Sequence, residues 1–207
     1  MHKNIILGAG GHAKEVLEVL IQNNSDEKVG FFNNTVSSNY RLFEKFEVYC
    51  KNDDLKHFDI FYLGIGNIRI RKILSSLALQ EGLRWKGVRS KKIQLGSFDT
   101  DIHETVDIMD NVSISSSVKI NRGTLLNRSV NIHHDVVIGE YCEIAPNAQI
   151  LGSAQIGNNV FIGAGAIILP KVVVGANTII GAGAVVTKNV AENMTVVGVP
   201  AESIHSD

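Results

Sequence analysis

The sequence has little of several features that would restrict what the protein can be. It contains two cysteines in 207 residues, which cannot form a disulfide framework. Its formal net charge of −1 at pH 7 gives no electrostatic basis for binding nucleic acid or an anionic membrane. No apolar run approaches the roughly 18 residues that a membrane-spanning helix needs, and the first residues lack the long apolar core of a signal peptide. A cytoplasmic protein without a nucleic-acid or membrane partner is the simplest interpretation.

What the sequence does contain is a repeat of six residues. From Ile102 to Val186 every sixth residue is Ile, Leu or Val, and the residue two places before each of them is small or β-branched. A helix places apolar residues about every 3.6 residues and an exposed strand about every 2, so this period fits neither. It is typical of a parallel β-helix, in which three short strands form one coil. The series fails at Gly96 and at Glu192, and residues 187–201 are expected to cover the open edge of the last coil.

The corners between the strands of such a helix turn sharply, and some of them require φ > 0. Glycine and asparagine tolerate this conformation best. Cys142 occupies one of the small inward positions, so we expect it to fill the core. Left-handed corner residues are expected among the glycines and asparagines between the strands, namely Gly139, Gly157, Gly163, Gly175, Gly181, Asn121, Asn127, Asn158, Asn159 and Asn177.

The first part of the chain has a different pattern. A buried strand at residues 3–7 runs into the glycine turn 8–11, and a helix follows it. Such a turn at a helix start presents free N–H groups to an anion. Gly8, Gly10 and Ala13 match the dinucleotide fingerprint. An NAD site also requires an acidic residue after the second strand, where this chain has Asn33 and Asn34, so NAD is a minor alternative. A purely structural role of the glycines in close packing of helix and strand stays open.

A second strand, glycine turn and helix follow, with the strand at residues 59–63 and the turn at residues 64–67. Together with short strands near residues 29–32 and 46–49, they predict a parallel α/β sheet of three or four strands, with its ligand at the carboxyl ends. A further strand is expected near residues 83–88. Arg69 and Arg71 could neutralise a phosphate or could simply be solvated. The predicted domains are a Rossmann-like domain, 1–88, and a β-helix domain with its cap, 89–207.

One corner of the β-helix differs from the others in its residue types. His134 should project outward two residues after the inward Ile132, and Asp135 could orient its imidazole and raise its basicity. Gly152 lies one coil further on in the same column, where its N–H could meet a ligand carbonyl. A solvated turn is the alternative for such a corner. A zinc site from His103, His133, His134 and Cys142 is disfavoured because Cys142 points inward.

The repeats end in Gly181-Ala-Gly-Ala-Val-Val-Thr-Lys188 and Val197-Gly-Val-Pro-Ala201, and the chain begins with Gly8-Ala-Gly-Gly-His-Ala13. With the His134-Asp135 corner, these motifs resemble the left-handed β-helix sugar acetyltransferases. The matching branch comprises bacillosamine and perosamine N-acetyltransferases and sialic acid O-acetyltransferase-like proteins. The resemblance implies a left-handed helix, acetyl-CoA as donor, and a homotrimer with active sites between neighbouring β-helices. No metal is expected. The usual crossover rule would have favoured the opposite hand.

The resemblance also implies roles for individual residues. His134 matches the catalytic base and Asp135 its acidic partner. Glu143 stands where some members have a second histidine. Backbone positions along acetyl-CoA are matched by Gly152, Ala164 and Ala182. The nucleotide sugar is expected at Gly10, Gly11, His12, Asn33, Asn34, Gly66 and Asn67, where two Asp are common in place of the two Asn.

The expected function is therefore N-acetylation of a nucleotide-linked 4-amino sugar, as its dTDP or UDP derivative, for bacterial surface-glycan synthesis. An asparagine both donates and accepts hydrogen bonds, which favours a pyrimidine base slightly over guanine. Two alternatives are a sugar O-acetyltransferase acting on a substrate such as sialic acid and a non-catalytic trimeric scaffold.

Overall fold

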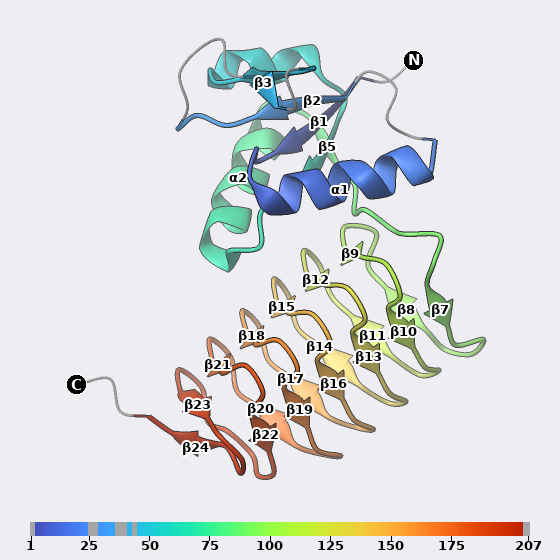
Figure 1. Cartoon of the computed structure of the whole chain (residues 1–207), viewed down its shortest axis with the longest axis vertical. Coiled ribbons are helices and arrows are strands. Elements are labelled where there is room, and N and C mark those ends of the chain that lie inside the picture. The colour runs from blue at the N-terminus through green and yellow to red at the C-terminus, as the bar shows by residue number, and fades with distance from the viewer. Residues whose placement is uncertain (1–2, 25–28, 36–40, 43–44, 205–207) are drawn as a thin grey trace. The chain divides into compact units, whose positions relative to one another are not determined.

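The computed structural model describes residues 3–24, 29–35, 41–42 and 45–204 (Figure 1). The chain divides into two compact units, Met1–Ser90 and Lys91–Asp207, whereas the sequence analysis set the boundary after residue 88. Each unit has its own secondary structure and is described by itself.

The first unit is an α/β sheet with the strand order β3-β4-β2-β1-β5-β6 in its described part. All neighbours pair in parallel except β3 and β4. The prediction of three or four strands was therefore too low. The two-residue strand β3 leaves almost no pattern in the sequence and was not predicted, whereas the strand expected near residues 83–88 is present as β6. The strands are β1 Asn4–Leu7, β2 Val29–Phe32, β3 Arg41–Leu42, β4 Phe46–Tyr49, β5 Ile60–Leu63 and β6 Arg84–Trp85.

Two α-helices follow the two glycine turns, and a 3-10 helix, η1 Asn52–His57, precedes β5. Helix α1 spans Gly11–Gln22 and helix α2 spans Ile68–Gln80. α1 begins directly after the turn that ends β1, and it buries Ala13 and Val16 against the sheet. A Cβ on Gly64 would lie 2.7 Å from the Cβ of Ala13, so the glycine after β5 allows α1 to approach the sheet closely.

The second unit is a parallel β-helix, as predicted. Three sheets run along it, with the orders β7-β10-β13-β16-β19-β22, β8-β11-β14-β17-β20 and β9-β12-β15-β18-β21-β23-β24 (Figure 1). The strands are β7 Gln94–Leu95, β8 Asp101–Ile102, β9 Asp107–Ile108, β10 Ser113–Ile114, β11 Lys119–Ile120, β12 Leu125–Leu126, β13 Asn131–Ile132, β14 Val137–Ile138, β15 Glu143–Ile144, β16 Gln149–Ile150, β17 Gln155–Ile156, β18 Phe161–Ile162, β19 Ile167–Ile168, β20 Val173–Val174, β21 Ile179–Ile180, β22 Val185–Val186, β23 Thr195–Val197 and β24 Glu202–Ser203.

The interior of the β-helix is a stack of aliphatic side chains in register. Ile114, Ile132, Ile150 and Ile168 pair in sequence along one sheet, each one coil above the last. Consecutive coils lie about 4.8 Å apart, the ordinary spacing of paired strands. The small residue two places earlier is also buried in nearly every repeat. The six-residue period therefore reflects one large and one small inward side chain for each face.

Every sixth residue from Asn111 to Gly183 adopts φ > 0 and forms a corner. These residues are Asn111, Ser117, Gly123, Ser129, Asp135, Tyr141, Asn147, Ser153, Asn159, Gly165, Lys171, Asn177 and Gly183. Our expectation is confirmed at Asn159 and Asn177 and wrong for the other glycines and asparagines named above. The left-handed position lies three residues before each inward aliphatic, and it accepts many residue types because repeated stacking over-determines it.

The glycines that follow the inward aliphatics are needed for another reason. A Cβ on Gly139 would lie 2.7 Å from the backbone N of Asn158, and a Cβ on Gly157 would lie 2.6 Å from that of Ala176. At these places the backbone of the next coil passes too close for a side chain. Glycine is therefore selected by contact between coils, not by its own φ.

A column of small polar side chains runs inside the β-helix. The Thr124 hydroxyl donates to the Gly139 carbonyl at 2.9 Å, and the Thr178 hydroxyl donates to the Ala191 carbonyl at 3.0 Å. Between them, the Cys142 thiol donates to the Gly157 carbonyl at 3.0 Å. Cys142 is fully buried, so it fills the core as expected and also satisfies a carbonyl there.

The two ends of the β-helix depart from the regular register. Leu95 pairs with Ile114, 19 residues later, whereas the coils after it are 18 residues apart. The apolar series fails at Gly96 because this first coil contains one extra residue. At the other end, Val185 hydrogen-bonds with Gly198 and Ala201, and β24 pairs antiparallel with β23. Residues 187–201 thus cover the edge, as predicted.

The close stacking of coils leads to a stability prediction. We expect Gly163→Ala to lower the free energy of unfolding by about 1–3 kcal/mol, the usual cost of overpacking, since the new Cβ would lie 2.5 Å from the backbone N of Ala182. Gly165→Asn is the matched control: Gly165 has φ +67° and open space around it, and asparagine occupies equivalent corners. Its effect should stay within about 0.5 kcal/mol. Denaturant unfolding of both variants tests this, and equal losses would contradict it.

Candidate active site

His134 and Asp135 lie at the corner between β13 and β14. The Nδ1 atom of His134 lies 2.7 Å from Oδ2 of Asp135. Asp135 occupies the left-handed corner position with φ 61°, which turns its carboxylate back toward the preceding side chain. A carboxylate can only accept, so Nδ1 carries a proton, and in the neutral imidazole the lone pair is therefore on Nε2. The corner therefore holds a histidine whose free nitrogen can act as a base.

Gly152 lies one coil above His134 in the same column. A Cβ on Gly152 would lie 2.6 Å from Cε1 and 2.7 Å from Nε2 of the imidazole. The Ser153 N–H donates to the His134 carbonyl at 2.9 Å, which links the two corners. The absence of a side chain at Gly152 is what leaves room for the imidazole ring beside it.

Gly152, Ala164 and Ala182 share one backbone feature. Within the described residues, none of their three N–H groups donates a hydrogen bond. Ala164 and Ala182 are exposed corner residues, placed between β18 and β19 and between β21 and β22. Gly152 lies instead between β16 and β17, on another edge of the prism. A single chain therefore does not bring the three expected acetyl-CoA contacts together.

The first glycine turn combines packing with open space. Gly8 has φ +118°, and a Cβ there would lie 2.7 Å from the Gly64 carbonyl oxygen. Gly10 and Gly11, by contrast, have nothing within 4 Å of a Cβ position. Gly8 therefore has the structural role that the sequence analysis left open, because it allows the two glycine turns to pack closely. Gly10 and Gly11 leave the start of α1 open to a ligand.

His12 lies in the first turn of α1. Its Nδ1 atom lies 3.0 Å from Oε2 of Glu15, so the carboxylate orients this ring as Asp135 orients His134. The Nε2 atom is buried and, among the described residues, has no hydrogen-bond partner. The imidazole is thus held in one orientation with an unused nitrogen.

Asn33 follows β2, at the same edge of the sheet as the glycine turns. Its Oδ1 accepts hydrogen bonds from the Thr35 N–H at 3.0 Å and from the Thr35 hydroxyl at 2.7 Å. Asn33 is half-buried and Asn34 is exposed. Thr35 was not recognised in the sequence, although an Asn followed two residues later by Thr is a common turn pattern.

The second glycine turn is stabilised by hydrogen bonds from side chains of helix α2 and its cap. The Asn67 side chain accepts from the Ile70 N–H at 3.1 Å and so caps α2. Arg71 is fully buried, and its guanidinium donates to the Ile65 carbonyl at 2.8 Å. Both expectations for Arg71, phosphate binding or solvation, were therefore wrong. Arg71 follows Asn67 by four residues, and this spacing places it under the turn. The sequence alone does not predict that Arg71 is buried there.

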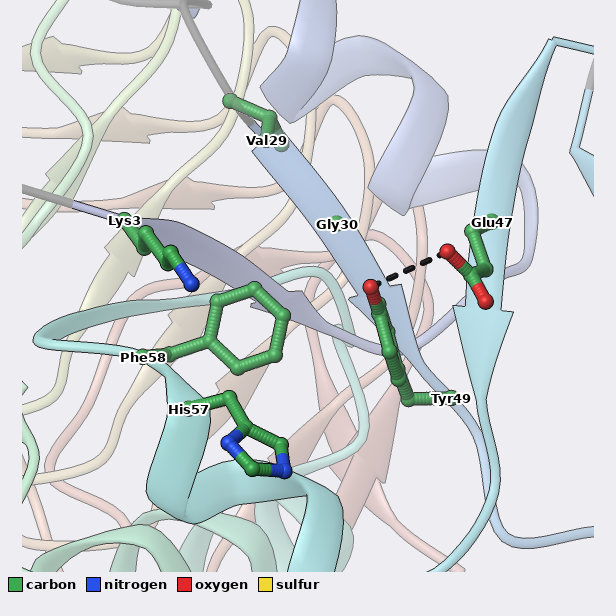
Figure 2. Close-up of a pocket in the computed structure, with 7 residues that line it drawn as sticks. All are labelled: Lys3, Val29, Gly30, Glu47, Tyr49, His57 and Phe58. Carbon is green, nitrogen blue, oxygen red and sulfur yellow. Dashed lines mark hydrogen bonds between the residues drawn. The ribbon is translucent and has the colours of Figure 1, made fainter.

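A cavity of about 280 Å³ also lies in the first unit. Figure 2 shows the rings of Tyr49 and Phe58 in it, with the Tyr49 hydroxyl directed at Glu47, to which it donates at 3.0 Å. Burial and this carboxylate raise the pKa of the Tyr49 hydroxyl. Lys3 precedes β1 and Gly30 lies near the start of β2, so the cavity faces away from the glycine turns. It contains none of the predicted site residues.

The two units match two domain models. Residues 117–152 and 153–188 match the model described as bacterial transferase hexapeptide (six repeats). Residues 3–77 match the PglD N-terminal domain. The chain is a hexapeptide-repeat acetyltransferase with a PglD-type N-terminal domain.

Solved structures support the assignment of this acetyltransferase. PerB from Caulobacter crescentus in complex with CoA and GDP-perosamine is 25% identical, with a TM-score of 0.89 over 99% of this chain and 98% of that one. WeeI from Acinetobacter baumannii is 28% identical, with a TM-score of 0.92 over 99% and 100%. The acetyltransferase domain of PglB from Neisseria gonorrhoeae with acetyl coenzyme A is 24% identical, with a TM-score of 0.88 over 98% and 99%.

The similarity also confirms the hand of the β-helix. These relatives are left-handed β-helix acetyltransferases, and a helix of the opposite hand could not superpose on them along its whole length. The acetyltransferase is therefore an exception to the right-handed crossover rule. In its described residues, no helix is long and apolar enough to cross a membrane.

Proposed function

We propose that the protein transfers the acetyl group of acetyl-CoA to the amino group of a nucleotide-linked 4-amino sugar. The observation that carries this proposal is the His134 imidazole, held by Asp135 with its free nitrogen beside Gly152. The complex of PerB with CoA and GDP-perosamine supports the same pair of substrates. The product is a building block for a bacterial surface glycan, and both substrates are cytoplasmic metabolites.

The chemistry follows from the atoms present at the corner. His134 Nε2 takes a proton from the attacking amine as the nitrogen forms its bond to the thioester carbonyl carbon. Asp135 stabilises the imidazolium that results. The Gly152 N–H donates to the oxygen as it becomes negative. Collapse of the tetrahedral intermediate breaks the carbon–sulfur bond, and the imidazolium returns its proton to the CoA thiolate.

The nucleotide part of the acceptor fits the first unit. The open turn at Gly10 and Gly11 leads into α1, and the first N–H groups of a helix favour a phosphate. His12 stands beside this turn, in the first turn of α1, and Glu15 holds its imidazole there. The Gly66 backbone belongs to the second turn at the same edge, while the Asn67 side chain serves mainly as the helix cap.

The active site needs more than one copy of the chain. His134 and Ala164 lie on different edges, and a face of about six residues at ~3.3 Å each separates neighbouring corners by more than ~15 Å. The side chains of His134 and Asp135 are 65% and 58% exposed in the single chain, so a lone chain leaves the base open to water. A second β-helix packed beside the first would bring the two edges together.

The family resemblance implies three copies around a three-fold axis, so we expect a homotrimer in solution. Its mass would be three times 22.5 kDa, or about 68 kDa. Analytical ultracentrifugation at micromolar concentration provides the measurement. A single monomer peak would contradict the trimer and, with it, the active site between chains.

Release of free CoA is the direct test of the function. The protein is incubated with acetyl-CoA and a thiol reagent, with nucleotide-linked amino sugars, sialic acid or no acceptor. Release that depends on an amino sugar supports N-acetylation. Release with sialic acid alone would point to the O-acetyltransferase alternative, and no release with any acceptor would point to a scaffold.

A further inference from the structure

Arg128 occupies the same place in its corner of the β-helix as His134 does in the next corner. The two residues are six positions apart, and each directly precedes a left-handed corner residue, Ser129 with φ 59° and Asp135 with φ 61°. Arg128 lies between β12 and β13, on the neighbouring edge of the prism, and is half-buried. Since the repeat gives both side chains the same starting direction, the guanidinium leaves its edge outward, as the imidazole leaves the next edge.

This edge also carries the two alanines that are expected at acetyl-CoA. Hydrogen bonds between consecutive coils place Arg128 in one column with Ala164 and Ala182. These bonds run from an N–H to a carbonyl one coil below, from Asn147 to Arg128 at 3.1 Å, from Gly165 to Pro146 at 2.9 Å and from Gly183 to Ala164 at 2.8 Å. The corners above Arg128, residues 145–148, 163–166 and 181–184, contain only Ala, Pro, Asn and Gly. Arg128 is therefore the one cation in these four corners.

The repeat also fixes the heights at which two neighbouring chains face each other. Acetyl-CoA can meet Gly152 of one chain and both alanines of the next only if the two β-helices run side by side in parallel. A rotation about an axis parallel to them keeps every residue at its own height. One coil of 18 residues rises about 4.8 Å, so residues six apart differ by about 1.6 Å in height.

These heights separate the cofactor contacts from Arg128. Gly152 lies about 4.8 Å above His134. The partner's Ala164 and the partner's Ala182 lie about 8 Å and 13 Å above it, whereas the partner's Arg128 lies only about 1.6 Å below. The acetyl-CoA arm thus occupies the levels above the imidazole. The guanidinium of the neighbouring chain faces the imidazole at its own level, on the side that is left for the acceptor.

We propose that the Arg128 guanidinium of one chain hydrogen-bonds the acceptor sugar in the active site that contains His134 of the next chain. This inference rests on the proposed function and assigns a further substrate-binding residue to it. On a 4-amino sugar, the hydroxyl on carbon 3 lies next to the reacting amine. The guanidinium donates to this hydroxyl and so directs the amine toward Nε2 of His134. With five N–H donors, a guanidinium can serve a ligand as well as groups of its own chain.

The alternative is that Arg128 serves only the fold of its own chain. Asp110 lies one coil below Arg128, because the Ser129 N–H donates to the Asp110 carbonyl at 3.0 Å. Lys92 pairs with the same aspartate at 3.4 Å, so this column alternates in charge. A role in neutralising Asp110 would act within one chain, whereas the proposed role acts between chains.

Hybrid trimers show which chain supplies the guanidinium. Chains with His134→Ala and chains with Arg128→Gln are coexpressed with different tags, and trimers that carry both tags are purified. Each such trimer has one interface at which an intact His134 faces an intact Arg128, so we expect about one third of the wild-type kcat/KM, well above that of either parent. Activity no higher than that of Arg128→Gln trimers would place the guanidinium in its own chain and overturn the proposal.

The kinetic constants of the single variant show what the guanidinium contacts. Arg128→Gln should raise the KM for the amino sugar and lower kcat/KM by about 10–100-fold, the value of a hydrogen bond to a charged group, while the KM for acetyl-CoA stays near wild type. A rise in the KM for acetyl-CoA alone would overturn the proposal. The matched control is Arg122→Gln, six residues earlier between β11 and β12, on the edge without predicted site residues. It should change neither constant by more than about twofold.

Arg128→Lys separates binding from folding. The ammonium keeps the positive charge near Asp110 but lacks the planar fork of donors. Its melting temperature should match wild type while the KM for the amino sugar still rises. With an acceptor that has hydrogen in place of the hydroxyl on carbon 3, wild type and Arg128→Gln should become equal. A difference that persists in full with this acceptor would overturn the assigned contact.

Calorimetry separates this inference from the proposed function, because binding requires no chemistry. A nucleotide-linked amino sugar is titrated into the full-length protein in the presence of CoA. If the wild type releases CoA but Arg128→Gln matches it in kinetics and affinity, the function stands and the inference fails. If no acceptor releases CoA but Arg128→Gln weakens binding of the sugar about tenfold and Arg122→Gln does not, the inference stands and the proposed function fails.

Discussion

Replacement of His134 by alanine is expected to lower kcat by about 10²–10⁴-fold, the usual contribution of a positioned general base. The KM for acetyl-CoA should change little, because the imidazole acts on the amine and not on the CoA arm. Steady-state assays of CoA release with a saturating amino sugar measure both constants. The Nδ1 contact of 2.7 Å to Asp135 is the structural basis for assigning the base to this residue.

His133→Ala is the matched control for this variant. His133 is the adjacent imidazole and is also exposed, but no carboxylate orients it in the described structure. Its replacement should leave kcat near the wild-type value. If instead His134→Ala retained full activity and His133→Ala lost it, the assignment would move to His133.

A single methyl group on Gly152 should have an effect of similar kind. The Cβ in Gly152→Ala would lie 2.6 Å from Cε1 of His134, so the imidazole must swing away from its column. A displacement of about 1 Å in a reacting group can cost about 10²-fold in rate, and we expect a loss of that order in kcat. The His134 side chain is 65% exposed, so the ring can move without unfolding the protein, and the melting temperature should stay close to wild type.

The double variant shows whether the effect of Gly152→Ala acts through the ring. In a His134→Ala background the imidazole is absent, so a methyl group on Gly152 causes no steric clash with it. The two losses should then be far from additive, with little further loss in the double variant. Additive losses would mean that the methyl group acts elsewhere, for example by blocking the approach of the thioester to the Gly152 N–H.

The β-helix could be predicted from the sequence because its constraint is local and repeated. Each coil buries one aliphatic and one small residue for each face, so the same requirement returns every six residues and accumulates over many matches. The same regularity made the corner at His134 and Asp135 stand out. The edge strand β3 was not predicted, because two residues of extended chain carry no periodicity to detect.

Several site residues could be located but not understood from the sequence. Gly152 was singled out for its N–H, while its missing side chain turned out to leave space for the imidazole one coil below. Asn33 was taken for a group that both donates and accepts, and only its contact with Thr35 shows that its oxygen is occupied. Arg71 was expected at a phosphate or in solvent, and it is buried under the second glycine turn.

The sequence by itself determined the two-domain plan, the three-sided prism and the position of the candidate base, because each of these follows from residue spacing along the chain. Only the tertiary structure decided which residues take φ > 0, why glycine follows the inward aliphatics, and which atoms of Asn33 remain free. Those properties depend on atoms that meet across neighbouring coils or around a turn. Such contacts have distances and directions in space, and a linear pattern of residue types does not contain them.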